Sequence, residues 1–194
     1  MKRKRVPSVR VLRRLLRLDP ETGKLYWRTR PAWMFQVKKG PYPKSHYAQI
    51  WNTRFADTEA FTATFSRPRN YRKGAIFGDT HQAHRIVFAL HYGRWPEGEV
   101  DHINGDGGDN RPKNLRDVSP TQNQRNRPEA LNNTSGATGV YWSKRRRRWY
   151  AQIKVARKPI HLGSFVHKSD AIAARKAAEL KFCFHPNHGR QRRG

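Results

Sequence analysis

The sequence has little cysteine, little negative charge and no long apolar run. Cys183 is the single cysteine among 194 residues, which excludes an internal disulfide framework and a cysteine-based zinc finger. Apolar residues make up 36% of the chain, mean hydropathy is −0.99, and no apolar run approaches the length of a membrane span. The length predicts one to three small domains, and the low apolar content predicts no large single core.

Negative charge is scarce, because 14 Asp and Glu residues stand against 41 Lys and Arg residues, for a net charge of +27. An excess this large predicts a polyanionic partner, with nucleic acid as the first candidate, because each phosphate contact releases counterions. Residues 1–5 (MKRKR) are basic, but no apolar segment follows them, so we do not expect a secretory signal. We interpret them as a basic tail that touches DNA, with a nuclear signal as the alternative in a eukaryote.

The chemistry is concentrated in residues 100–127, VDHINGDGGDNRPKNLRDVSPTQNQRNR. Residues 99–103 predict a short strand, and the Asn, Asp and Gly residues that follow predict a turn. Residues 114–118 predict a second strand. The order strand, loop, strand is then completed by a helix.

That helix has a clear start signal. Ser119 suits the N-cap, Pro120 suits the first helical position, and Gln122 completes a capping box. We expect the helix to continue to about Arg127 and to stop before Pro128. The whole stretch therefore predicts a ββα unit.

Four side chains of this unit carry roles that phosphodiester hydrolysis requires. His102 can act as a general base, because the ordinary pKa of histidine lies near physiological pH. Asp101 offers a hard oxygen ligand for magnesium or manganese, Asn114 could hold the second ring nitrogen of His102, and Asn123 could add a neutral oxygen ligand. Neighbouring residues of a strand point to opposite faces, so Asp101 and His102 can share a site only where the strand twists or ends.

The motif DHINGD…DNR…NL…S…QN resembles the HNH endonucleases, also called ββα-metal or His-Me finger nucleases, and most closely their phage and intron-encoded homing group. In that family the His after the Asp is the base, and an Asn twelve residues later orients it, which corresponds to His102 and Asn114. The acidic metal ligand corresponds to Asp101, and the last motif position, Asn in one subgroup, corresponds to Asn123. The resemblance implies one divalent metal ion, magnesium with manganese able to substitute, and double-stranded DNA as the partner. The alternative is a polar, turn-rich hairpin without catalysis.

Residues 84–92, HRIVFALHY, predict a helix with a broad apolar face that Gly93 and Pro96 end. The HR-x-V-x-x-x-H-x-G pattern accompanies the nuclease motif in the family that the chain resembles. Arg85 is a candidate phosphate contact, whereas we interpret His84 and His91 as packing and hydrogen-bonding residues.

The first 83 residues carry no catalytic motif. Residues 9–18 predict a short amphipathic helix, and residues 24–28 predict a strand after a turn. Residues 47–71 predict a small, loop-rich β region, and the segment around Gly78 and Asp79 predicts a hairpin. We interpret this part as a scaffold that also contacts DNA.

Residues 128–138 predict a linker, after which strands at 139–142, 149–155 and 160–165 precede a helix at 169–182. The motifs SGATGVYW, RRRRWYAQI, IHLGSF and DAIAARKAAE resemble the APETALA-two/ethylene-response-factor DNA-binding domain from residue 133 to about residue 185. That resemblance implies a sheet laid in the major groove. The candidate DNA contacts are Tyr141, Lys144, Arg146, Arg148, Trp149, Tyr150 and Lys154.

The sequence thus predicts an α+β protein of several small units. These are a scaffold at 1–83, a ββα-metal nuclease centre at 84–127, a linker at 128–138, a three-stranded antiparallel sheet plus helix at 139–185 and a basic tail at 186–194. The predicted function is an HNH endonuclease that cuts or nicks DNA in the cytoplasm of a phage or bacterial host, with no membrane contact and no evident protein partner. A non-catalytic DNA-binding regulator with a decayed HNH centre is the rival, and a ribonuclease has the same charge logic.

Overall fold

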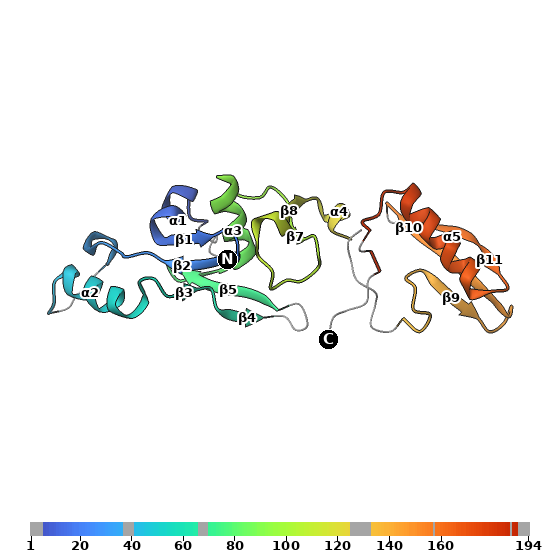
Figure 1. Ribbon diagram of the computed structural model, residues 1–194, viewed down its shortest axis with the longest axis horizontal. Helices are drawn as coiled ribbons and strands as arrows, with labels where there is room; N and C mark the ends of the chain where they lie inside the picture. Colours follow the sequence, from blue (N-terminus) through green and yellow to red (C-terminus); the bar gives the residue numbers. More distant parts are fainter. Residues whose placement is uncertain are drawn as a thin grey trace. The chain divides into compact units, whose positions relative to one another are not determined.

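The computed structural model describes residues 6–36, 41–65, 70–124, 133–156, 158–186 and 188–189. Its two compact units are Met1–His102 with Asp106–Asp117, and Ile103–Gly105 with Val118–Gly194 (Figure 1). Both units combine helices with small sheets, so the predicted α+β class is confirmed. In the part of the chain that is described, no helix has both the length and the apolar character to cross a bilayer.

Among its described residues, the first unit has three small sheets and three α-helices. The helices are α1 (Val9–Leu15), α2 (Lys44–Phe55) and α3 (Ala83–Tyr92), with short 3₁₀ turns at η1 (Ala32–Met34) and η2 (Pro112–Asn114). The first sheet has the order β1 (Leu16–Asp19), β2 (Lys24–Trp27), β3 (Glu59–Ala60), and the second has the order β4 (Ala63–Phe65), β5 (Tyr71–Ile76), β6 (Asp79–Gln82). The third pairs β7 (Glu99–His102) with β8 (Leu115–Val118).

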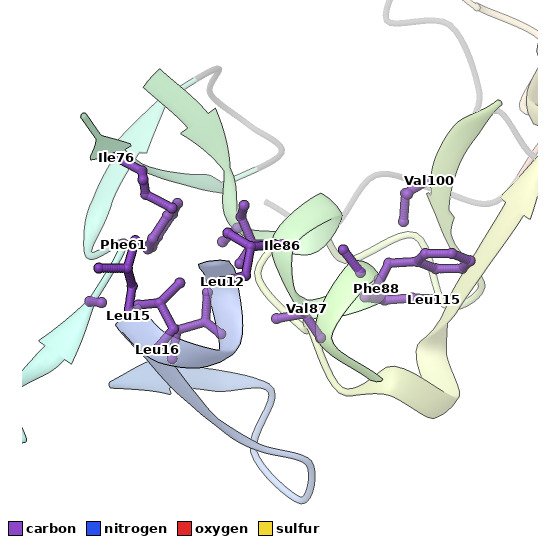
Figure 2. Close-up of a cluster of buried hydrophobic side chains, with 14 residues drawn as sticks. Leu12, Leu15, Leu16, Phe61, Ile76, Ile86, Val87, Phe88, Val100 and Leu115 are labelled. Carbon is purple, nitrogen blue, oxygen red and sulfur yellow. The ribbon is translucent and has the colours of Figure 1, made fainter. Parts of the chain in front are cut away.

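The core of this unit forms around α3, which is apolar over most of its surface. Ile86 and Val87 are fully buried on it and belong to the same cluster as Leu12 of α1 (Figure 2). The same cluster includes Val100 of β7 and Leu115 of β8. Both strands of the ββα unit therefore contribute a side chain to the buried core. Burying an aliphatic side chain of this size contributes roughly 1.5–3 kcal/mol.

Two expectations for the first unit were wrong in detail. The predicted helix over residues 9–18 ends at Leu15, because Leu16–Asp19 pairs antiparallel with β2 instead. The predicted hairpin near Gly78 is present, but its turn falls on Phe77 and Gly78, since Asp79 already pairs with Ile76.

The region expected to be loop-rich and β at residues 47–71 contains α2, which is the largest departure. Only Ala48 of this helix is buried, so it lacks the apolar stripe that would indicate a helix. Instead, the Arg30 guanidinium lies 3.8 Å from the ring centroid of Trp51, and Asn52 bonds both the backbone N–H and the carbonyl of Arg30 at 2.8 and 3.0 Å. Arg30, which lies outside α2 in the sequence, therefore stabilises this helix.

The second unit contains α4 (Pro120–Gln124), β9 (Val140–Ser143), β10 (Arg148–Val155), β11 (Lys158–Phe165) and α5 (Lys168–Lys181). The sheet is antiparallel in the order β11-β10-β9, and α5 covers one of its faces (Figure 1). Ala171 of α5 and Ala151 of β10 are both fully buried, which lets the helix approach the sheet closely. The predicted helix end near Arg127 and residues 128–132 of the predicted linker lie outside the described residues.

Candidate functional site

The ββα unit places Asp101 and His102 at the end of strand β7, the only place where adjacent residues could share a site. Both are buried, with 9% and 3% of their surfaces exposed. Asp101 Oδ2 accepts from Arg116 Nη2 at 2.7 Å and from Arg116 Nε at 3.0 Å across the two-stranded sheet. Burial lowers the pKa of His102, and the charge of the Asp101 carboxylate is one of the influences that oppose this shift.

Asn110 is the residue that sequence reasoning missed. Its Oδ1 lies 3.0 Å from His102 Nε2, and Asn110 itself is 3% exposed. An amide oxygen can only accept, so Nε2 carries the hydrogen and Nδ1 carries the lone pair that can take a proton. The Asp109-Asn110 pair was visible in the sequence shortly after His102, but nothing local singled it out from the other asparagines of the stretch.

Asn114, the predicted orienting residue, acts on the loop that carries Asn110. Its Nδ2 donates to the Asp109 carbonyl at 2.8 Å, and its backbone N–H donates to the Arg111 carbonyl at 2.8 Å. The side chains of Asp109 and Arg111 are joined by two further hydrogen bonds of 2.8 and 2.6 Å. Hydrogen bonds among its own backbone and side-chain groups therefore stabilise this loop.

Two aromatic rings lie close to His102. The His84 ring meets it edge to face with centroids 5.2 Å apart, and Tyr71 lies 5.7 Å from it. Burial lowers the pKa of His102, opposed mainly by the hydrogen bond to Asn110. Burial, helped by the nearby charges of His102 and Arg85, lowers the pKa of His84 to about 3. Both imidazoles are therefore neutral at neutral pH, which a base that is to accept a proton requires.

The other predicted residues of this region take separate places. Arg85 donates through Nη1 to the Gly98 carbonyl at 3.0 Å, so its guanidinium ties α3 to the start of β7. Asn123 lies on α4 in the second unit. The predicted capping box is confirmed there, because Ser119 N–H donates to Gln122 Oε1 at 2.9 Å and Gln122 N–H donates to Ser119 Oγ at 3.3 Å.

The second unit has an open sheet face opposite α5. Arg148, Tyr150 and Lys154 alternate with the buried Ala151 and Ile153, so they project away from the helix. The ring of Tyr150 stacks on Tyr141 with centroids 5.6 Å apart and lies 5.5 Å from His161.

The three remaining predicted contacts are Lys144, Arg146 and Trp149. Lys144 and Arg146 lie in the exposed turn between β9 and β10, where Arg146 Nη1 donates to the Tyr150 hydroxyl at 3.2 Å. Trp149 lies on the helix side, where it packs against the core of this unit under Lys168. The outer face therefore carries aromatic rings framed by cations.

Residues 81–125 match the family model described as HNH endonuclease. The matched segment includes α3, β7, β8 and the loop with Asn110, and it supports a nuclease that acts on DNA. No curated protein and no solved structure matches the chain.

Proposed function

We propose that the protein is a metal-dependent endonuclease of the HNH type that hydrolyses phosphodiester bonds in double-stranded DNA, as homing and phage nucleases do. The single observation that carries this is the buried hydrogen bond between His102 Nε2 and Asn110 Oδ1. It leaves the imidazole in the tautomer in which Nδ1, and not Nε2, can accept a proton. The match of residues 81–125 to HNH endonucleases supports the same activity.

In this proposal His102 takes a proton from the water that attacks the scissile phosphorus, as the oxygen of that water forms the new P–O bond. The bond to the leaving sugar oxygen breaks, and that oxygen is protonated by solvent. Asn110 holds the ring against rotation, while Asn114 holds the loop that carries Asn110. A positioned general base typically contributes about 10²–10⁴-fold to the rate.

The donor set fits a hard divalent ion. No group of three or more His, Cys, Asp and Glu side chains that could hold a metal occurs among the described residues, so a cage made by protein ligands alone is not built there. Magnesium commonly keeps several waters and takes one or two protein oxygens plus substrate phosphate, which suits the carboxylate of Asp101 as a ligand. Manganese prefers the same oxygens. Bound there, the ion would stabilise the negative charge that develops on the phosphate.

The second unit supplies the wider DNA contact in this proposal. Tyr141, Tyr150 and Lys154 would face the duplex from the open sheet, with Lys144, Arg146 and Arg148 beside them. Rings and cations on a sheet suit groove and backbone contact, as in the APETALA-two-like domain that this segment resembles. Trp149 would support that face from the helix side rather than touch DNA.

One observation favours the second candidate, a DNA-binding regulator with an inactive centre. His102 is only 3% exposed, as a histidine retained for packing would be. In that case the protein binds DNA without cutting it, and replacing His102 lowers stability alone.

The decisive experiment incubates supercoiled plasmid with the full chain and magnesium, manganese or chelator. We expect nicked or linear product with either metal and none with chelator. The Asp101→Ala variant should need about 10–100-fold more metal for half-maximal cleavage. Intact plasmid under every metal condition, with DNA binding retained, would favour the regulator, and equal metal requirements would place the ion away from Asp101.

A further inference from the structure

The turn between β1 and β2 lies against the loop that holds His102, although the two are far apart in the sequence. Gly23 closes this turn, with its N–H donating to the Asp19 carbonyl at 2.8 Å. A Cβ atom at Gly23 would lie 2.2 Å from the carbonyl carbon of Asn110 and 2.4 Å from the backbone nitrogen of Arg111. Real Cβ atoms do not approach backbone this closely, so the two segments fit only because position 23 has no side chain.

Backbone conformation alone does not explain this contact. Gly23 has φ +71°, in the left-handed region that favours glycine. Gly78 has a similar φ of +85°, yet a Cβ there would meet nothing within 4 Å. At Gly74 a Cβ would lie 2.8 Å from the ring and 3.1 Å from the Cα atom of Phe61, outside the loop that carries Asn110. Among these three, only Gly23 packs against the loop of the candidate site.

The residue that Gly23 contacts, Asn110, is also a hydrogen-bond partner of His102. Asn110 presents its side-chain oxygen to His102 and its backbone to Gly23. Its neighbours in the loop are fixed from the other side by Asn114 and by the Asp109–Arg111 pair. Asn110 is thus held between the loop's own hydrogen bonds and the β1–β2 turn.

We propose that Gly23 is a positioning residue of the nuclease centre, acting through the backbone of Asn110 on the orientation of His102. The turn at residues 19–23 is then a working part of the site and not a detached scaffold. This inference rests on the proposed function, since it assigns His102 the role of base. It predicts that a side chain at position 23 displaces Asn110 and lets the imidazole leave its working orientation.

The test compares Gly23→Ala and Gly23→Asn with Gly78→Ala and Gly74→Ala in the full chain. Asn tolerates the left-handed region, so Gly23→Asn adds the clash with little backbone penalty. We expect both Gly23 variants to lose about 10–100-fold in single-turnover cleavage at saturating DNA, with DNA affinity unchanged. Gly78→Ala should cut at the wild-type rate, and Gly74→Ala should lower the melting temperature while the folded fraction keeps its rate.

A double-mutant cycle separates positioning from general damage. If Gly23 acts through Asn110, then Asn110→Ala combined with Gly23→Asn should reduce the rate no more than the more harmful single change does. Nitrogen NMR of the imidazoles should show a shifted tautomer balance for His102 alone in the Gly23→Asn protein. Rate effects that multiply, or an unchanged His102 spectrum, would overturn the inference.

His102→Ala, measured in parallel, keeps the two proposals apart. If that variant cuts as well as the wild type, the proposed base is wrong. If it is inactive while folded Gly23→Asn cuts normally, the base assignment stands and the positioning role of Gly23 fails.

Discussion

His102 and His84 in the first unit are almost fully buried, whereas Tyr141 and His161 in the second unit lie on an open sheet face. The first pair is surrounded by ring contacts and a buried hydrogen bond. The second belongs to a row of stacked rings bordered by Arg and Lys side chains. The rings of the first pair are therefore enclosed by protein, whereas the rings of the second pair are open to solvent.

The functions proposed for the two regions would place different demands on their side chains. A base must be held in one tautomer and kept neutral, which burial and a fixed amide oxygen provide. A surface that tracks a charged duplex gains more from solvent-exposed cations and aromatic faces, because phosphate contact is summed over many weak interactions. Substitutions in the first unit should therefore lower the cleavage rate, and substitutions in the second unit should lower the affinity for DNA.

The largest effect is expected from His102→Ala. Cleavage should fall about 10²–10⁴-fold, because the base acts in the transition state, while DNA affinity stays nearly the same. Single-turnover cleavage and fluorescence anisotropy with a labelled duplex measure the two quantities. His91→Ala, an exposed histidine on α3, is the matched control and should leave both unchanged. Comparable cleavage rates in the two variants would remove His102 from the mechanism.

A smaller effect of the opposite kind is expected from replacing Arg146 and Arg148 with Ala. Affinity should fall, and the slope of log affinity against log salt should decrease by about 0.9 for each phosphate that the variant no longer neutralises. The rate at saturating DNA should not change. Replacing Lys168 and Lys181 of α5 removes the same charge from the other side of the sheet and serves as the control. An equal fall in affinity in both double variants would mean that the open face has no special role.

A third effect is expected in the dependence of stability on pH. The pKa of His84 is lowered from 6.5 to about 3 by burial, so between those values the unfolded chain binds a proton that the folded chain does not. Stability should therefore fall as the pH drops from 6.5 toward 3, and this residue contributes about 1.4 kcal/mol for each pH unit. His84→Phe should reduce that slope by about one proton. Urea unfolding at several pH values decides it, and identical slopes for variant and wild type would contradict it.

Local signals predicted the elements that local forces build. The helix at α3, the capping box at Ser119 and the strands of the second unit follow from apolar periodicity and turn residues, and they are present. The helix at α2 could not be predicted in this way, because Trp51 and Asn52 hold it through Arg30, a residue outside it. Local patterns fail wherever a distant partner offers stronger interactions.

The same limit applies to the candidate site. Sequence spacing identified Asp101, His102 and Asn114, and the roles given to them and to Asn123 stay predictions. Asn110 was missed because several asparagines and aspartates crowd residues 101–110, and only the folded loop shows which one meets the imidazole. The packing of Gly23 on that loop lies beyond any local pattern.

The contact between Gly23 and Asn110 joins segments that are synthesised at different times. The β1–β2 turn leaves the ribosome long before the loop that it supports, and α1 can already pack on α3 while that loop is still inside the exit tunnel. His102 emerges ahead of Asn110, so the histidine is complete before its partner is available. On the proposed function, the nascent chain therefore contains α1 and α3 before His102 and Asn110 can form the candidate site.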